Sequence, residues 1–432
     1  MKVLQKFSLF IFIFLLSVSS SHAMDLKIKL TRVKAPYVFH AQSATYIKDG
    51  NEDIFFIDDS PTLKISLRGK KIFLGKNSFF LPVTLYASEN RFYINGKGYR
   101  GRLYINPVDG GYNFLNVLDI EDYLKGVVTK EMPANWPLEA IKAQSIIART
   151  YAIYKATRSE DKGFDLYDST LDQVYYGIEG ESDTGLMAVR ATKDMILLHN
   201  GKIIKSFYHS TSGGRTELPE MVWGEKYPYL TSITCNFDRA SPAFYWEYKI
   251  SKRNLENLLR KAGYPGRNLK RIKTLRYTPS GRNKMMRVMY QNRSYVDIPG
   301  TDFRQIVGNG KLKSTLFHVV SRADSIFFNG RGSGHGVGLC QWGARGMAEK
   351  GKTYQQIIKK YYKNIEINKI SYVHGEAMSD FIEKEIDDNT FKQKKSKNDK
   401  GDILSSFIEK ADEQDLNEES ERGKIPLKDI VK

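Results

Sequence analysis

Hydrophobic and polar residues alternate in the first part of the chain, which is the pattern of β-strands that bury one face. The alternating apolar positions are Leu26, Ile28 and Leu30, and then Leu63, Ile65 and Leu67. The dipeptide Asn95-Gly96 follows another apolar run and is typical of a tight hairpin turn. Residues 24–95 are therefore predicted to form a β-rich N-terminal region.

After this region the apolar spacing changes to the period of amphipathic helices. Asp119 is expected to cap a short helix, and Asn135 is expected to cap a longer one with Pro137 in its first turn. The apolar stripe of the longer helix consists of Ala140, Ala143, Ile147, Tyr151 and Tyr154. Further helices are expected over 251–263, 340–350 and 354–362, and β structure over 270–328. This order of elements predicts an α+β fold, with mixed β lobes and helices that flank a substrate groove.

Both ends of the chain differ in composition from residues 96–374, which we expect to form the main domain. At the N-terminus Lys2 and Lys6 precede an apolar run, and the small residues Ser21 and Ala23 follow it. This order is typical of a secretory signal peptide over residues 1–23, and the alternative is an uncleaved anchor. Residues 375–432 contain basic and acidic blocks, and we expect a charged, flexible tail. The predicted location is the periplasm or the cell envelope.

Composition narrows the classes of function. The 432 residues include 67 Lys and Arg against 49 Asp and Glu, a formal net charge of +18. This excess predicts an anionic partner such as nucleic acid, a membrane surface or an acidic polysaccharide. Because an exported protein rarely meets nucleic acid, we expect no nucleic-acid partner. The hydrophobic content of 41% excludes wholesale disorder, and two cysteines exclude a scaffold held by many disulfides.

Glu131 is the strongest candidate for a catalytic group. It follows the predicted short helix and precedes Met132-Pro133, where the chain must leave helical geometry. Apolar neighbours would remove water from its carboxyl and raise its pKa, so that the side chain could act as a general acid. The alternative is a helix-end glutamate that pairs with Lys130 or Arg149.

A line of polar residues lies beside the apolar stripe of the longer predicted helix. It consists of Gln144, Ser145 and Arg149. Arg149 would suit a carboxylate ligand, because a guanidinium group binds a carboxylate through two hydrogen bonds. The alternative is an ordinary solvated helix face.

Two glycine-rich segments carry the histidines of interest. The first contains His209, Ser210 and Ser212, without the nucleophile elbow or the orienting acid of a serine hydrolase. The second contains His335 and matches neither common nucleotide-binding pattern. A zinc ion could in principle take four ligands from the cysteines and histidines of these regions, namely His209, Cys235, His335 and Cys340. A disulfide between the cysteines or two free thiols are the alternatives, and we expect no metal or other cofactor.

Seven motifs in a fixed order, over about residues 99–370, resemble the sporulation stage II protein D family (SpoIID/LytB), which consists of bacterial cell-wall proteins. The first are Tyr99-Arg100-Gly101, Tyr123-Leu124 with Gly126-Val127 and Glu131-Met132-Pro133, and Ala140 with Ala143-Gln144 and Ala148-Arg149-Thr150-Tyr151. The others are Gln173-Val174-Tyr175 with Gly177, His209 to Thr216, Val222-Trp223-Gly224, and Gly334 to Gly338 with Gln341 and Gly343-Ala344.

The resemblance implies a protein that binds the glycan strands of peptidoglycan. It also implies lytic transglycosylase activity, which cleaves the bond between N-acetylmuramate and N-acetylglucosamine in peptide-stripped strands and leaves a 1,6-anhydro end. The catalytic glutamate of the family maps onto Glu131. The candidates for binding the substrate are Gln144, Ser145, Arg149, Tyr151, Gln173, Tyr175, His209, Ser210, Ser212, His335 and Gln341.

The main alternative is a non-catalytic glycan-binding protein that activates a partner amidase, because some members of the family are described in this way. Such a protein would share the glycan-binding surface but would need no general acid. A zinc peptidase is a weaker alternative, since the sequence lacks the His-Glu-x-x-His pattern.

Overall fold

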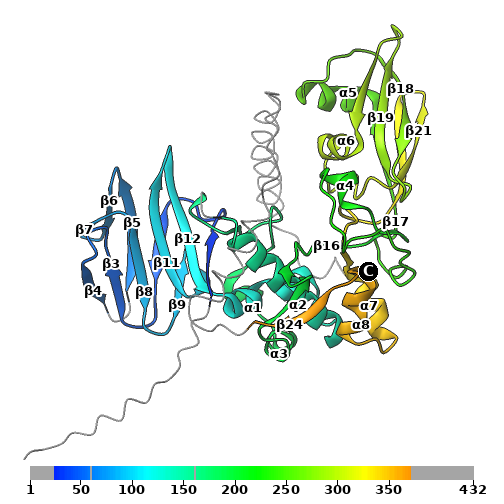
Figure 1. Ribbon diagram of the computed structural model, residues 1–432. Helices are drawn as coiled ribbons and strands as arrows, with labels where there is room; N and C mark the ends of the chain where they lie inside the picture. Colours follow the sequence, from blue (N-terminus) through cyan, green and yellow to red (C-terminus); the bar gives the residue numbers. More distant parts are fainter. Residues whose placement is uncertain (1–23, 59–60, 160–161, 371–432) are drawn as a thin grey trace, which may run out of the picture. The chain divides into compact units, whose positions relative to one another are not determined.

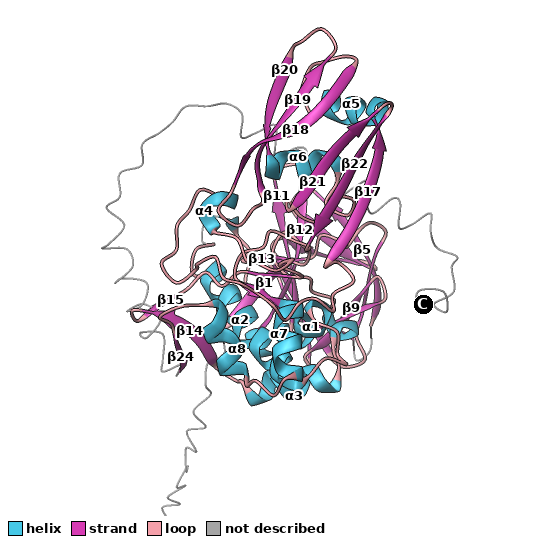
Figure 2. Ribbon diagram, turned by 90° about the vertical axis from the view of Figure 1, so that its right-hand side faces the viewer, coloured by secondary structure: helices cyan, strands magenta, loops and turns pink. Residues whose placement is uncertain are grey.

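The computed structural model describes residues 24–58, 61–159 and 162–370 (Figure 1). The predicted signal peptide and the charged tail therefore lie outside the described residues. The described part combines helices with many strands in several sheets, which confirms the α+β class (Figure 2). No helix within these residues is both long and apolar enough to cross a membrane.

Two sheets are built largely from the N-terminal region. The strands of the first are β1 (Asp25–Lys29), β3 (Thr45–Lys48), β4 (Ile54–Asp58), β8 (Val83–Ala87), β11 (Arg102–Val108), β12 (Gly111–Asp119) and β13 (Leu166–Tyr167). The strands of the second are β2 (Tyr37–His40), β5 (Thr62–Arg68), β6 (Lys71–Leu74), β7 (Asn77–Phe80), β9 (Arg91–Ile94) and β10 (Lys97–Arg100). Their orders are β13-β1-β12-β11-β8-β3-β4 and β10-β9-β2-β5-β6-β7.

The strand pattern predicted from the sequence is confirmed here. Leu26 and Ile28 are fully buried in β1 and the residues between them are not. Asn95 and Gly96 form the turn between β9 and β10 with positive φ angles of 51° and 79°. β1 pairs with β12, so the first sheet includes strands on both sides of residue 95.

A group of helices follows the first sheet, and two of the sequence motifs lie in its first two helices. These helices are α1 (Ile120–Glu131), α2 (Leu138–Ala156), α3 (Asp183–Ala191), α7 (Gln341–Glu349) and α8 (Tyr354–Tyr361), with a 3-10 turn η2 (Gly177–Gly180). α2 packs against α1, α3, α7 and α8, and therefore forms the centre of the group. One hydrophobic core joins these helices to both N-terminal sheets.

The helix ends largely follow the predictions. The Asp119 carboxylate accepts hydrogen bonds from the backbone N–H groups of Glu121 and Asp122, which confirms it as the cap of α1. The predicted cap at Asn135 was wrong, because Pro137 is the N-cap residue and α2 begins at Leu138. The helices predicted near 340–350 and 354–362 are confirmed as α7 and α8.

Several short strands lie between or after the helices of this group along the chain. β14 (Met195–His199), β15 (Lys202–Ile203) and β24 (Glu366–Lys369) form a three-stranded sheet. β16 (Tyr208–His209) pairs in parallel with β23 (Leu339–Cys340), and this pairing brings the two predicted histidine segments together. A short helix, α4 (Pro219–Val222), follows the first of these segments.

Residues 245–331 form a lobe with a hydrophobic core of its own. Its elements are β17 (Tyr245–Ser251), α5 (Lys252–Lys261), β18 (Leu269–Tyr277), β19 (Asn283–Tyr290), β20 (Tyr295–Pro299), α6 (Gly300–Val307), β21 (Phe317–Arg322) and β22 (Ser325–Arg331). They form two three-stranded sheets, β18-β19-β20 and β17-β22-β21. α5 confirms the predicted helix at 251–263, whereas α6 lies in a stretch that was predicted to be entirely β.

Candidate functional site

Glu131 is the last residue of α1, and the chain turns away from the helix immediately after it. Met132 has extended backbone angles of φ −127° and ψ 131°, as expected for a residue before proline. Val127 and Val128 of the same helix are fully buried, so the C-terminal end of α1 is anchored in the core. Glu131 itself is of intermediate burial, so part of the residue reaches the surface.

Polar groups from three other segments surround the carboxyl of Glu131. The backbone N–H of Val174 donates to Oε1 at 2.9 Å. The Tyr208 hydroxyl and the Gln341 amide also face the carboxyl and stabilise its charged form. Burial opposes them and is the largest effect, so the pKa of Glu131 is raised above its ordinary value.

The alternative role of Glu131, an ion pair at the helix end, is not found in the described residues. Arg149 binds Glu121, and the ammonium group of Lys130 lies over the Tyr176 ring at 5.2 Å from its centre. The carboxyl therefore has hydrogen-bond donors around it but no cationic partner that would lower its pKa strongly.

Tyr208 links Glu131 to a buried hydrogen-bonded line. The Nε2 of Gln173 donates to the Tyr208 hydroxyl at 3.2 Å, and the Tyr123 hydroxyl donates to the Oε1 of Gln173 at 3.1 Å. Gln173 is fully buried, so it positions Tyr208 from behind and does not reach solvent. Tyr208 was not among the predicted site residues, although it is next to His209 in the sequence.

His209 and His335 lie close together, with their ring centres 5.7 Å apart. The Nδ1 of His209 is hydrogen-bonded to the Val337 carbonyl oxygen at 3.0 Å, and His335 is hydrogen-bonded to the backbone of Tyr208. Burial lowers the pKa of His209 well below its ordinary value and that of His335 to about 3. Both rings are therefore neutral at pH 7 and can offer hydrogen bonds but not a positive charge.

Aromatic side chains surround this region on the partly exposed side. Phe207 and Trp223 are stacked with ring centres 4.4 Å apart, and Trp223 lies 4.9 Å from the ring centre of His335. Trp223 is 43% exposed, which is unusual for so large an apolar side chain. Trp342, next to Gln341 in α7, packs against Trp136 at 4.9 Å.

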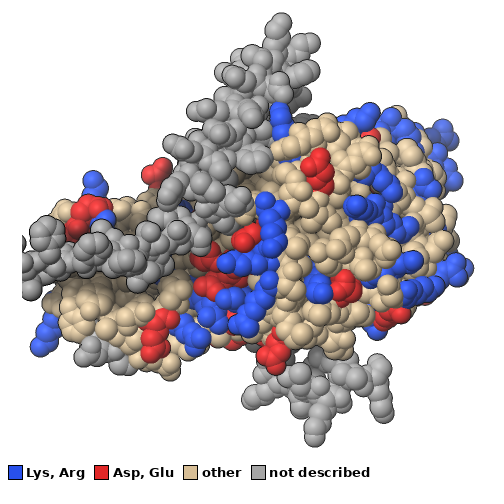
Figure 3. Space-filling model, turned by 60° about the horizontal axis from the view of Figure 1, so that its bottom comes forward, with Lys and Arg blue, Asp and Glu red and all other residues tan. Residues whose placement is uncertain are grey.

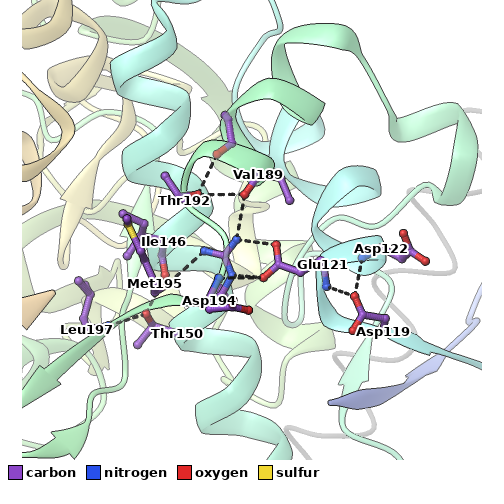
Figure 4. Close-up of polar contacts among 12 residues, drawn as sticks. Asp119, Glu121, Asp122, Ile146, Thr150, Val189, Thr192, Asp194, Met195 and Leu197 are labelled. Carbon is purple, nitrogen blue, oxygen red and sulfur yellow. Dashed lines mark hydrogen bonds and ion pairs between the residues drawn. The ribbon is translucent and has the colours of Figure 1, made fainter. Parts of the chain in front are cut away.

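The predicted polar line on α2, formed by Gln144, Ser145 and Arg149, faces the interior of the protein. All three side chains are fully buried. The Nε and Nη2 of Arg149 donate to the Glu121 carboxylate, and its Nη1 donates to the Met195 carbonyl oxygen. Figure 4 shows Glu121 and Met195 in this hydrogen-bonded region. Ser145 donates to the Ile141 carbonyl oxygen of its own helix. Because tertiary packing covers this face, it is neither solvated nor open to a sugar.

Three other predicted binding residues are also engaged within the protein. The Tyr175 hydroxyl donates to the Oδ1 of Asn116 at 2.7 Å, the Tyr151 hydroxyl to Asp172 at 2.9 Å and the Ser212 hydroxyl to Asp238 at 2.6 Å. Ser210 remains partly exposed. The structure therefore groups Glu131, His209, His335 and Gln341 around Tyr208, with Gln173 behind it, whereas the other candidates except Ser210 are buried or hydrogen-bonded within the protein.

The residues that could hold a metal differ from the predicted set. Within the described residues, Cys235, Asp238 and Cys340 form a buried group whose ligand atoms all lie within 4.8 Å of one another. Asp238, and not His209 or His335, accompanies the two cysteines. Both thiols are free.

The positive charge of the chain is concentrated in the lobe. Residues 245–331 contain 19 Lys and Arg against 5 Asp and Glu, an excess of 14 in a chain with a net charge of +18. On the face shown in Figure 3, Lys and Arg lie in several places among uncharged residues. The excess of positive charge in the lobe favours binding to an extended anionic polymer.

Two models of protein families match parts of this chain. A family model described as stage II sporulation protein matches residues 108–199, and a domain of unknown function (DUF8618) matches residues 223–338. The first match covers the whole of α1, α2 and α3 and includes Glu131. The second covers the lobe and ends just before β23.

Several curated relatives match over longer stretches. An uncharacterised protein of Brachyspira hyodysenteriae is 32% identical over 363 residues, which cover 82% of this chain and 96% of the relative. The stage II sporulation protein D of Bacillus subtilis is 31% identical over 58% of this chain and 75% of its own length. The amidase enhancer of Bacillus subtilis is 30% identical over 77% of this chain, and the match spans about half of that relative, 54%.

The fold and the site thus define an α+β protein with Glu131 as its candidate acid–base carboxyl. The extent and identity of these matches place the chain in a known family. It belongs to the stage II sporulation protein D family (SpoIID/LytB).

Proposed function

We propose that the protein is an exported lytic transglycosylase that cleaves the glycan strands of peptidoglycan in the cell envelope. The observation that carries this proposal is the setting of Glu131, whose carboxyl has a raised pKa, accepts a hydrogen bond from Val174 and is faced by Tyr208 and Gln341. A raised pKa favours the protonated form of the side chain, which is the form that general acid catalysis requires. The relatives named for sporulation and for amidase enhancement support a role at the cell wall.

In the first step Glu131 donates its proton to the glycosidic oxygen between N-acetylmuramate and N-acetylglucosamine. The bond from that oxygen to the muramate anomeric carbon breaks, and positive charge develops on the sugar ring. Glu131 is now a carboxylate, and Val174, Tyr208 and Gln341 stabilise it. These donors therefore act most strongly after the proton has left, when the enzyme needs them.

In the second step the Glu131 carboxylate removes the proton from the 6-hydroxyl of the same muramate. The oxygen attacks the anomeric carbon and closes the 1,6-anhydro ring, and Glu131 returns to its protonated form. No water enters the product, so a second carboxyl to activate water is not required. The acids closest in sequence are engaged elsewhere: Asp119 caps α1, Glu121 binds Arg149 and Asp122 binds Lys125.

We expect the glycan to contact two regions, namely the aromatic residues beside His335 and the positively charged lobe of residues 245–331. The exposed ring of Trp223 offers an apolar face on which a sugar ring can stack, and the neutral His335 beside it offers a hydrogen-bonding edge. Glycan strands without stem peptides carry one free lactyl carboxylate on each muramate. The excess of 14 positive charges in the lobe is complementary to this repeating anion.

A second candidate function is activation of a partner amidase without catalysis. The match to the amidase enhancer favours it, since that relative is named for this role. In this case the same surfaces would hold the glycan or the amidase, and the charge state of Glu131 would not matter.

The experiment that separates the two functions uses purified protein and peptide-free glycan strands. We expect products with 1,6-anhydro-muramate ends by mass spectrometry, and we expect the Glu131→Gln variant to lose them. Glu139→Gln is the matched control, because Glu139 also lies on a helix of this group but binds Lys142 at its surface. If wild-type protein yields no anhydro ends but stimulates a cell-wall amidase equally with and without Glu131, the enzymatic proposal is wrong.

A further inference from the structure

The two cysteines of the chain are far apart in the sequence and meet in the structure. Cys235 lies in the loop before the lobe and Cys340 lies in β23 after it, and both are fully buried. The carboxylate of Asp238, also fully buried, completes the group. We propose that Cys235, Asp238 and Cys340 bind a divalent cation of the zinc class, in a site separate from Glu131.

The spacing of the ligand atoms fits such an ion. With a Zn–S distance of about 2.3 Å and a Zn–O distance of about 2.1 Å, two ligands at a tetrahedral angle lie about 3.6 Å apart. The Sγ of Cys340 and the Oδ2 of Asp238 are 3.6 Å apart. The mutual limit of 4.8 Å for all three ligand atoms is consistent with a single shared ion.

A second observation points to a missing partner at the same place. The Oδ1 of Asp238 is buried and has no hydrogen-bond partner in the described residues. A buried carboxylate oxygen without a partner is costly, and an ion is one of the few groups that can satisfy it in the absence of a donor. The buried guanidinium group of Arg282 contributes positive charge near Asp238 and Cys340, but it donates to other groups.

Hydrogen-bond donors surround the two sulfur atoms, as they do around metal-bound thiolates. The backbone N–H groups of Ser212 and Gly343 both point at the Sγ of Cys340, at 3.2 and 3.4 Å. The Tyr361 hydroxyl lies 3.2 Å from the Sγ of Cys235. A neutral thiol is a weak acceptor, whereas a metal-bound thiolate accepts such hydrogen bonds readily.

The Asp238 ligand is supported in the same way. The Ser212 hydroxyl and the Gly213 N–H donate to its Oδ2 at 2.6 and 2.9 Å, and the Cys340 thiol, which would lose its proton on binding an ion, faces the same oxygen at 3.6 Å. These contacts fix the carboxylate, so that an ion beside the Cys340 sulfur could bind either of its oxygens. A tetrahedral ion needs a fourth ligand, which a water molecule or the Ser212 hydroxyl would supply.

The position of the group gives the ion a structural role. Cys235 and Cys340 lie on either side of the lobe in the sequence, so an ion would join the segments that enter and leave it. Cys340 also caps α7, whose first residue is Gln341. Gly343 leaves room for the sulfur, because a Cβ at this position would lie 2.6 Å from the Sγ of Cys235. Loss of the ion would therefore loosen the lobe and the helix that presents Gln341 to Glu131.

The test uses the full chain purified under reducing conditions and measures metal content by mass spectrometry of the element. We expect close to one equivalent of zinc, a fall in melting temperature after chelation, and recovery of that temperature when zinc alone is returned. Exchange with Co²⁺ is expected to give the intense near-ultraviolet absorption of thiolate-to-cobalt charge transfer, which reports cysteine ligation directly.

Substitution of each proposed ligand tests whether that residue binds the metal. Cys235→Ser and Cys340→Ser are each expected to lose the bound metal and the cobalt absorption, and Asp238→Asn to bind more weakly. Glu217→Gln is the matched control, because Glu217 is a buried acid of the preceding segment that accepts hydrogen bonds from Thr278 and Ser280 and lies outside the group. It is expected to retain full metal content.

Three results would overturn the proposal, and none of them bears on glycan cleavage. One is a reduced, folded chain that holds no metal and takes up no cobalt. Another is metal content unchanged in the cysteine variants, which would mark adventitious binding. The third is a native chain lighter by two hydrogens and resistant to alkylation after unfolding, which would show a disulfide between Cys235 and Cys340 as the native state.

Discussion

The Arg149 guanidinium group and the Glu121 carboxylate form a two-bond ion pair that joins α2 to α1. Nε binds Oε1 at 2.7 Å and Nη2 binds Oε2 at 2.8 Å (Figure 4). Arg149 is fully buried, and the carbonyl oxygen of Met195 accepts a further hydrogen bond from it. The pair therefore fixes the helix whose last residue is Glu131, although neither member lies beside the Glu131 carboxyl.

Replacement of Arg149 by methionine is expected to reduce the free energy of unfolding strongly. The change leaves the Glu121 carboxylate without its buried partner, which typically costs about 3–5 kcal/mol. Urea unfolding followed by fluorescence measures the loss. Arg345→Met is the control, because Arg345 forms a surface pair with Glu349 that contributes less than about 1 kcal/mol. Weakened glycan binding by a fully stable Arg149→Met protein would contradict the scaffold role.

Replacement of Glu131 by glutamine is expected to lower the rate of glycan cleavage by about 10²–10⁴-fold, the usual contribution of general acid–base catalysis. The stability of the protein at neutral pH should not fall. The folded pKa of Glu131 is raised, so its charged form is disfavoured by folding, and an uncharged amide removes this cost. Product analysis and thermal unfolding of the same sample test both parts. A normal rate in the variant would exclude Glu131 as the acid.

The Tyr208 hydroxyl should set the upper pH limit of the reaction. It stabilises the Glu131 carboxylate and so lowers its pKa relative to burial alone. Tyr208→Phe is therefore expected to raise the pKa and to move the basic side of the pH–rate profile to higher pH. Tyr123→Phe is the control, since its hydroxyl contacts Gln173 and not the carboxyl. An unchanged profile in Tyr208→Phe would separate Tyr208 from the proton transfer.

His209 and His335, whose pKa values are lowered in the folded protein, should make the protein sensitive to acid. Their pKa values are lowered in the folded state, that of His335 to about 3, so below about pH 6.5 only the unfolded chain takes up these protons. Stability is therefore expected to fall as the pH drops from 6.5 toward 3, by up to about 1.4 kcal/mol per pH unit for each histidine.

His335→Gln is expected to make this fall shallower in urea unfolding measured at several pH values. His318→Gln is the control, because His318 is exposed on β21. Equal slopes in wild type and His335→Gln would show that His335 becomes charged in the folded protein without cost.

Charge reversal on the lobe is expected to weaken binding to peptide-free glycan and to reduce its dependence on salt. Lys273 and Arg276 are exposed on β18 and suit a double Glu variant. A double Glu variant of Lys64 and Lys97, which are exposed in the six-stranded sheet, gives the same change in net charge elsewhere. Co-sedimentation with glycan strands measures both. Equal losses in the two variants would show that only the total charge matters.

Local signals were sufficient for the elements that carry the catalytic candidate. Asp119 followed by an apolar helical pattern predicted α1, and the Met-Pro dipeptide predicted that the chain leaves the helix just after Glu131. Capping and the effect of proline act over a few residues, so the sequence contains the whole cause. The strands around Leu26 and the turn at Asn95-Gly96 were predictable for the same reason.

Residue spacing was not sufficient where the role of a side chain depends on which other element packs against it. Gln144, Ser145 and Arg149 form a polar line in any helical drawing of α2, and the pattern does not say that α3 and β14 cover it. Tyr208 was missed because its role depends on β16 pairing with β23, which lies far along the chain. Such pairing follows from packing of the whole core and has no local signature.

The sequence by itself determined the class of fold, the helix that ends at Glu131, the family motifs and the strongly positive charge, since these depend on composition and on neighbours in the chain. Only the tertiary structure decided which polar groups face Glu131, that Arg149 belongs to the scaffold, and that Cys235, Asp238 and Cys340 share one buried place. These relationships join segments far apart in the chain, and burial and hydrogen bonding between such segments are settled only when the complete core has formed.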